Sequence, residues 1–203
     1  MVRPQPQPTL ETERLRLRPF TLGDAGAVQA FAGAREVAAT TLTIPHPYKD
    51  GMAEAWIRTH APGYEADEQA TFALTLRQTQ QLVGAIGLVI NRPNGRAELG
   101  YWVGIPFWNQ GYATEAAREI LRFGFEELDL NRIFAQHLTR NPASGRVMEK
   151  AGMQHEARLR QHINKSGRFE DIDLYGVLAE EWRLPAFSAA APSRRGRSAR
   201  GRA

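Results

Sequence analysis

Residues 98–115 read ELGYWVGIPFWNQGYATE and decide the fold, because they change from strand periodicity to helix periodicity across one short loop. Apolar residues alternate through 99–103, as they do in a strand with one buried face. Pro106 interrupts this pattern, and from Tyr112 the apolar positions recur at helical spacing. The first N–H groups of a helix lack partners within the helix, and the helix dipole adds positive potential there. The junction therefore favours a bound phosphate.

Small residues occupy the turn at this junction. Gly111 and Ala113 leave the backbone accessible to a pyrophosphate, and Thr114 adds a hydroxyl donor. Close packing of a helix against a sheet also uses small residues, so spacing alone leaves both interpretations open. No Lys-Ser or Lys-Thr pair follows, and no second glycine completes a dinucleotide fingerprint. This excludes a P-loop and disfavours a Rossmann site.

Outward from this junction, the periodicity predicts several strands and helices. Strands are expected at 14–18, 70–77, 82–91, 97–103, 131–138, 153–163 and 169–178. Helices are expected after Phe20, at 52–64, from Tyr112 and at 141–152, with a proline-rich loop at 40–48. This order favours an α/β (α+β) domain, with a mixed central sheet of about seven strands and helices on both faces.

Caps are predicted at the ends of two helices. Thr21 or Asp24 is expected to cap the first helix. Asn141 is a suitable N-cap for the helix at 141–152, and Gly152 follows its last turn.

Composition predicts one packed domain, since 42% of the 203 residues are hydrophobic and 24% are charged. We expect a flexible leader at 1–9, a domain at 10–185 and a disordered arginine-rich tail at 186–203. Five arginines in the last ten residues account for the net charge of +4, so the rest of the chain is close to −1. Only the tail is therefore suited to a weak contact with RNA or the ribosome.

Several classes of protein are excluded or disfavoured by composition. The chain has no cysteine, which excludes disulfide scaffolds, thiolate zinc sites and a cysteine nucleophile. Its five histidines lack ligand spacing, so no metal is expected. The longest apolar run, at 82–90, is too short to span a membrane, and the leader lacks a signal core. We expect a soluble, cytoplasmic protein without a membrane partner.

Five motifs in a fixed order resemble the GNAT acetyltransferases. They are LETERLRLRP at 10–19, ELGYWV at 98–103, WNQGYATEA at 108–116, NPASGRVMEKAGM at 141–153 and GRFEDIDLYGVL at 167–178. Within the family, the chain is similar to the bacterial ribosomal-protein N-terminal acetyltransferases, the Rim-type enzymes for alanine or serine. The likeness covers roughly 10–182. It implies a GNAT fold with a sheet splayed at the cofactor site, and acetyl transfer from acetyl-CoA to a primary amine.

The resemblance also implies which residues contact acetyl-CoA. These are Tyr101, Trp102, Val103 and Gly104 along the strand, Asn109, Gln110, Gly111, Tyr112, Ala113 and Thr114 at the turn, and Asn141. Trp108 stands where the wider family has Gln or Arg, as is usual in this subgroup. Phosphate binding is therefore expected to depend mainly on backbone N–H groups.

Two residues are the candidates for proton transfer. Glu98 begins the strand that the resemblance places along the cofactor, and it faces away from Leu99, so it is the candidate base. Many GNAT members use a tyrosine to protonate the thiolate, but Met148 occupies that position here. Ser144 is the alternative donor that the ribosomal subgroup suggests. A backbone N–H near Val103 is expected to stabilise the developing oxyanion.

The acceptor pocket is expected to include His46, Tyr48 and Asp171. A protein N-terminus is favoured as acceptor, because an α-amine has a pKa of about 7.7–8.0 against about 10.4 for lysine. An aminoglycoside or polyamine acetyltransferase is the alternative enzyme. A non-catalytic acyl-CoA-binding protein that docks on RNA or the ribosome through the tail is the alternative of another class. The sequence leaves a homodimer and the acyl-chain preference open.

Overall fold

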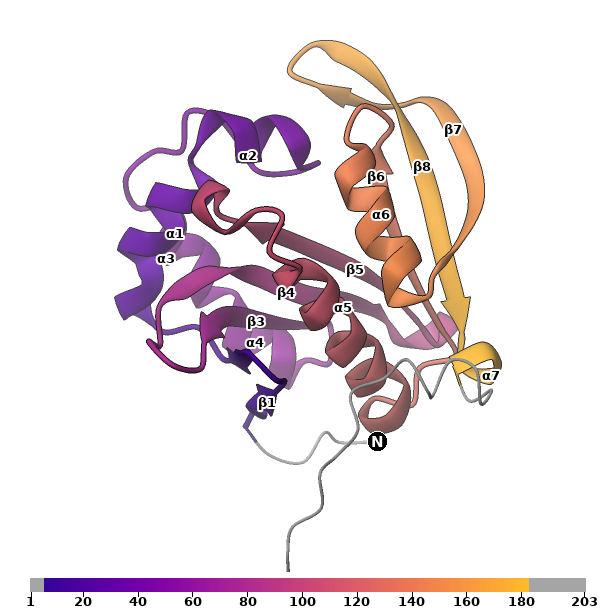
Figure 1. Cartoon of the computed structure of the whole chain (residues 1–203), viewed down its shortest axis with the longest axis horizontal. Coiled ribbons are helices and arrows are strands. Elements are labelled where there is room, and N and C mark those ends of the chain that lie inside the picture. The colour runs from indigo at the N-terminus through magenta and orange to yellow at the C-terminus, as the bar shows by residue number, and fades with distance from the viewer. Residues whose placement is uncertain (1–5, 183–203) are drawn as a thin grey trace, which may run out of the picture.

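The computed structural model describes residues 6–182 and contains one mixed sheet (Figure 1). The strands are β1 (Leu10–Glu11), β2 (Leu15–Arg18), β3 (Gln69–Leu76), β4 (Leu82–Asn91), β5 (Arg96–Val103), β6 (Arg132–Leu138), β7 (Gln154–Lys165) and β8 (Arg168–Leu178). Their order is β1-β2-β3-β4-β5-β6-β8-β7, and among these neighbours only β5 and β6 are parallel. The predicted mixed sheet is confirmed. The observed sheet contains one strand that was not predicted, the two-residue β1, which is too short to show a periodicity.

Helices cover both faces of the sheet, as predicted. They are α1 (Ala25–Ala32), α2 (Arg35–Thr40), α3 (Met52–Arg58), α4 (His60–Glu65), α5 (Tyr112–Arg122), α6 (Pro142–Ala151) and α7 (Ala179–Trp182). In Figure 1, α5 crosses the front of the sheet and α6 lies over β6. These two helices enclose the larger core, which includes Leu88, Ile120 and Ile133. On the opposite face, α1 and α3 cover Ala85 and Trp102.

The helix predicted at 52–64 is interrupted, so this prediction is wrong in its extent. The chain forms two helices, α3 and α4, which are separated at Thr59. Pro62 explains the break, because a proline has no N–H to donate and its ring would clash with the carbonyl of Arg58 within a continuous helix. In the observed structure Pro62 falls in the first turn of α4, where no such bond is needed.

The parallel pair β5 and β6 separates part of the way along. Their register joins Arg96 to Arg132, Ala97 to Ile133 and Glu98 to Phe134, and it ends there. Beyond Glu98, β5 continues to Val103 beside β4 alone. The sheet therefore opens between β5 and β6, and this is the splay that the resemblance implies.

The chain ends lie largely beyond the described residues. Within the predicted leader, Gln7 donates a side-chain hydrogen bond to the Thr71 carbonyl at 2.8 Å. Residues 1–5 of the leader, and the tail predicted at 186–203, are outside the described range. No helix within 6–182 is both long and apolar enough to cross a membrane.

The first residue of α4 is a buried histidine. His60 is 3% exposed, and neither ring nitrogen has a hydrogen-bond partner among residues 6–182. Its ring packs against Phe20 and Trp56 at centroid distances of 5.2 and 4.4 Å. Burial lowers the pKa of His60 to about 4, so the side chain is neutral in the folded protein at physiological pH.

Acid is expected to destabilise the fold through His60. The unfolded chain, with an ordinary histidine pKa near 6.5, binds the proton more tightly than the folded chain. Stability from neutral His60 is complete above pH 6.5 and is lost as the pH falls toward 4, so moving from pH 7.5 to pH 5 costs about 2 kcal/mol. Urea unfolding at both pH values measures this loss, and His60→Leu should remove it. An equal loss in the variant would show that His60 is not responsible.

Candidate active site

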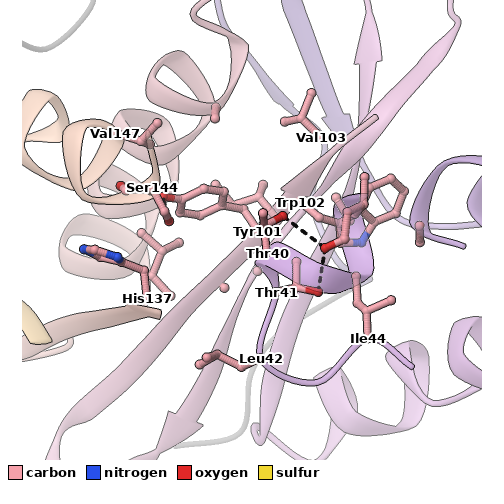
Figure 2. Close-up of a pocket in the computed structure, with 18 of the residues that line it drawn as sticks. Thr40, Thr41, Leu42, Ile44, Tyr101, Trp102, Val103, His137, Ser144 and Val147 are labelled. Atoms are coloured by element: carbon pink, nitrogen blue, oxygen red, sulfur yellow. Dashed lines mark hydrogen bonds between the residues drawn. The ribbon is translucent and has the colours of Figure 1, made fainter. Parts of the chain in front are cut away.

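A cavity of about 830 Å³ follows the opening between β5 and β6. Its wall is formed by β5, the start of α5, the inner face of α6 and the segment 40–45. Figure 2 shows Tyr101 reaching from β5 toward Ser144 on α6, with Thr40 at the end of α2 and Thr41 and Leu42 directly after it. The cavity thus brings together segments that are far apart in the sequence.

The turn before α5 exposes its backbone to this cavity. Gly111 has a φ of 82° and Asn109 a φ of 60°, both in the left-handed region, so the chain reverses tightly just before the helix. The backbone N–H groups of Tyr112, Ala113 and Thr114 have no acceptor among the described residues. These residues also line the cavity, so the free donors and the positive end of the helix dipole lie beside it.

Arg14 holds this turn in place, a role that the sequence analysis missed. Its guanidinium donates to the Gln110 carbonyl at 2.9 Å and to the Glu115 carboxylate at 2.7 Å. It also lies over the Tyr112 ring, 4.7 Å from the centroid. Burial would raise the pKa of Glu115, but hydrogen bonds from Thr12 and Arg14 outweigh burial and lower it. Glu115 therefore stays ionised and anchors Arg14.

Asn141 contacts the opposite side of the cavity instead of capping α6. Its side chain makes no capping hydrogen bond, which corrects the predicted N-cap role. The amide donates to the Thr40 carbonyl at 3.1 Å, at the C-terminal end of α2. Asn141 thereby connects α6 to the loop at 40–45 across the opening, a long-range contact that outweighs the local preference of asparagine for a cap.

Ser144 and Tyr101 meet across the opening. Their hydroxyl oxygens are 2.7 Å apart, and the Tyr101 hydroxyl also donates to the Ser144 carbonyl at 3.0 Å. Burial raises the pKa of Tyr101 well above its ordinary value, against the smaller lowering effect of the hydrogen bond with Ser144. The phenol therefore stays neutral, keeps its proton and donates a hydrogen bond to the Ser144 carbonyl. The Ser144 hydroxyl can then donate to Tyr101 or to a bound molecule.

Glu98 lies at the point where β5 and β6 separate. Gln136 on β6 donates to the Glu98 Oε1 atom at 2.8 Å. The second carboxylate oxygen has no hydrogen-bond partner among the described residues, and the side chain is half-buried and lines the cavity. Glu98 therefore presents one oriented, free oxygen to a bound molecule. Gln136 was not singled out from the sequence, since only the parallel register places it beside Glu98.

Most of the candidate residues meet at this cavity. Its lining includes Glu98, Ser144, Tyr48, Tyr101, Trp102, Val103, Asn109, Gly111, Tyr112, Ala113, Thr114 and Asn141. Met148, in the position of the family's tyrosine, also lines it and is 2% exposed. The lining does not include Gly104 and Gln110. Gly104 packs against Phe31, and the Gln110 side chain donates back to the Pro106 carbonyl at 3.0 Å.

Two predicted acceptor residues lie away from the cavity. His46 is exposed, and its Nδ1 atom is 3.2 Å from the Gly33 carbonyl. Asp171 accepts a hydrogen bond from the Gln161 backbone at 2.8 Å. Neither residue is part of the lining. His46 lies in a loop, and Asp171 lies on β8 opposite the irregular stretch of β7 between Leu159 and Ile163. The direction of both side chains depends on tertiary contacts that the sequence does not show.

His137 is a cavity residue that the sequence analysis did not select. It is 5% exposed, and its Nδ1 atom is 2.7 Å from the Leu138 carbonyl. Its Nε2 atom has no partner in the described part of the chain. The sequence contained a signal for His137. Buried and half-buried residues alternate along β6, and His137 is on the same buried face as Ile133 and Ala135.

Comparison with known proteins identifies the class of the molecule. The model of the acetyltransferase (GNAT) domain family matches residues 14–154, and the chain belongs to this family of N-acetyltransferases. It is 33% identical over 172 residues to the uncharacterized N-acetyltransferase YoaA of Bacillus subtilis, covering 84% of this chain and 97% of YoaA. It is 31% identical over 138 residues to YdaF of the same organism, named "putative ribosomal N-acetyltransferase", covering 66% of this chain and 71% of YdaF.

A solved structure shows the same architecture. The GNAT-family acetyltransferase from Bacillus anthracis superimposes with a TM-score of 0.77 at 29% identity, covering 85% of this chain and 99% of that chain. The predictions of a GNAT fold and of an acyltransferase are thereby confirmed.

Proposed function

We propose that this enzyme transfers an acetyl group from acetyl-CoA to the α-amine of a protein N-terminus. The observation that carries the proposal is the continuous cavity from the start of α5, through the opening between β5 and β6, to Glu98. The free N–H groups at the start of α5 and the Glu98 carboxylate both line this cavity, which supports a phosphate site and a base within one cavity. The likeness to YdaF supports a protein acceptor.

The residues at the α5 end suit the phosphates and the amide-rich arm of acetyl-CoA. The free N–H groups of Tyr112, Ala113 and Thr114 can bind a pyrophosphate. Arg146 and Lys150 on α6 also line the cavity and add positive charge. Beyond Glu98, the edge of β5 that faces β6 has no partner strand, so its backbone is open to peptide-like groups. The exception is the Val103 carbonyl, which accepts a hydrogen bond from Trp108 Nε1 at 2.6 Å. The bound cofactor would supply an acetyl thioester.

Glu98 is the candidate for accepting the proton of the amine. Glu98 lines the cavity, and Gln136 donates to one of its carboxylate oxygens while the other has no hydrogen-bond partner among the described residues. A positioned base of this kind contributes about 10²- to 10⁴-fold to a rate. An α-amine suits it, because a useful fraction is already neutral near pH 7.5. A lysine amine would need a much stronger base or a lowered pKa.

Replacing Ser144 by alanine is expected to lower kcat by about tenfold, because one hydrogen bond to the leaving thiolate is worth about 1–1.5 kcal/mol. The dissociation constant of acetyl-CoA should stay within about twofold. Stopped-flow turnover and calorimetric binding measure the two quantities. The matched variant Ser188→Ala removes a serine outside the described residues. An unchanged kcat for Ser144→Ala would remove Ser144 from the mechanism.

A panel of acceptors tests the proposed function. CoA release is measured with peptides that have a free alanine or serine N-terminus, with N-blocked peptides that carry an internal lysine, and with an aminoglycoside. We expect turnover with the free N-termini alone. Turnover restricted to the aminoglycoside or to internal lysine would overturn the protein N-terminus as acceptor, while leaving the family assignment intact.

A further inference from the structure

Two glycines leave the sheet bare on the side of Glu98. Gly87 on β4 lies directly opposite Gly100 on β5, and Thr71 on β3 pairs with Gly87. Residues directly opposite each other in antiparallel strands share a face, and residues two apart on a strand do so as well, so Gly100 shares the face of Glu98. All four residues line the cavity. We call Thr71, Gly87 and Gly100 the glycine floor.

No helix within residues 6–182 covers Gly100. The next row of the sheet, Ala85 opposite Trp102, is buried beneath α1 and α3. At Gly100, in contrast, a side chain would meet no atom within 4 Å. The open part of the floor beside Glu98 is therefore at Gly100, where the main chain of an acceptor can lie on the sheet; at Gly87 an added Cβ would already be 3.0 Å from the Thr71 Oγ1 atom.

The charges of the lining restrict what can lie there. Glu98 is the sole acidic residue among the described residues that line the cavity, and the lysine and arginine of the lining, Lys150 and Arg146, are on α6. Burial and, to a smaller extent, the charge of Glu54 raise the pKa of Tyr48, but Glu54 is not part of the lining. A second ammonium group in this region would thus be desolvated without a partner, which is costly.

Apolar and hydroxyl-bearing residues form the rest of the wall near the floor. Leu42 and Ile44 come from the loop at 40–45, and Tyr48 and Trp56 from the segment that follows. Such a wall stabilises uncharged, apolar groups by removing them from water. The uncharged wall and the single carboxylate of Glu98 together favour an acceptor that has one amine and no other charged group.

Building on the proposed function, we propose that the glycine floor selects acceptors that carry one amine followed by uncharged, apolar groups. In a protein substrate, the residues directly after the N-terminal α-amine would be uncharged. Polyamines and N-termini followed by lysine or arginine would be poor acceptors. Gly100 provides the space that the acceptor occupies, and Glu98 with the uncharged wall sets the selection by charge.

The first test fills the floor. Gly100→Val places a side chain in open space, so it should raise KM for a neutral peptide at least about tenfold. The acetyl-CoA dissociation constant should stay within about twofold, which also shows that the variant is folded. Gly26→Val is the matched control, because Gly26 on α1 is exposed, lies outside the cavity and also has no atom within 4 Å of an added side chain. An unchanged KM in Gly100→Val would overturn the proposal.

The second test separates this proposal from the proposed function. Four acceptors are compared: two peptides and two small amines, and in each pair only one member carries additional amines. They are the peptide Ala-Val-Leu-Gly-Ser, its analogue with lysine at the second and third positions, phenethylamine and spermidine. We expect kcat/KM for the neutral peptide to exceed that for the lysine analogue and spermidine at least about tenfold. Equal turnover of both peptides would overturn the charge selection and leave N-terminal acetylation standing. If phenethylamine is acetylated and neither peptide is, the proposed function is overturned and the selection by charge still stands.

Discussion

Replacing Glu98 by glutamine is expected to lower kcat by about 10²- to 10⁴-fold, because the amide cannot accept the amine proton. The geometry gives the reason for the size of the effect. Gln136 donates to the Glu98 Oε1 atom at 2.8 Å, and the other oxygen of this cavity-lining side chain has no hydrogen-bond partner among the described residues. Glutamine preserves the shape of the side chain, so the dissociation constant of acetyl-CoA should be nearly unchanged.

The dependence of the rate on pH separates a base from a structural role. In the natural enzyme, protonation of the base should reduce kcat at low pH, and Glu98→Gln should abolish this low-pH limb. Glu13→Gln is the matched control, since it removes an exposed carboxylate that is not part of the cavity. A Glu98→Gln enzyme with full activity and the same low-pH limb would exclude Glu98 as the base.

Replacing Gly111 by valine is expected to weaken acetyl-CoA binding by about 10- to 100-fold, because hydrogen bonds from backbone N–H groups to a charged phosphate are worth about 1.5–3 kcal/mol. Gly111 has a φ of 82°, which a β-branched residue strongly disfavours. An added Cβ would also lie 3.3 Å from an Arg14 nitrogen. Both effects would move the free N–H groups at the start of α5 away from their positions. Isothermal titration calorimetry measures the change.

Gly167→Val is the matched control for Gly111→Val. Gly167 has a φ of 84° in the turn between β7 and β8, and it lies outside the cavity lining. The two variants should therefore lose similar stability from backbone strain, but only Gly111→Val should lose acetyl-CoA affinity. Equal affinity in both variants would show that the turn before α5 does not bind the phosphates.

The periodicity of the sequence predicted much of the fold, because it reports which residues of a strand or helix are buried. The strand at 82–91 coincides with β4, and Gly152, with a φ of 100°, ends α6 as expected. Features decided by single residues or tertiary contacts were missed. Pro62 divides a helix that looks continuous by hydrophobic pattern, and Asn141 reaches Thr40 although it precedes a helix.

The candidate site was predictable where its residues are contiguous in sequence. The turn before α5 is one local segment, so its motif and its geometry coincide. The pairing of Glu98 with Gln136 and of Tyr101 with Ser144 joins residues 38 and 43 positions apart, and it depends on strand order and register. Local patterns carry no information about that register. For the same reason, the sequence could not show that His46 and Asp171 lie outside the cavity, or that Glu98 is the sole acidic residue among the described residues that line it.

The most direct test of N-terminal acetylation is the position of the acetyl group on a peptide that offers two amines. The peptide Ala-Val-Leu-Gly-Lys-Ser, with a free N-terminus, is incubated with the enzyme and acetyl-CoA, and the product is sequenced by tandem mass spectrometry. We expect a mass increase of one acetyl group, carried entirely by the N-terminal fragment ions. Acetylation of the lysine side chain with a free N-terminus would contradict this expectation.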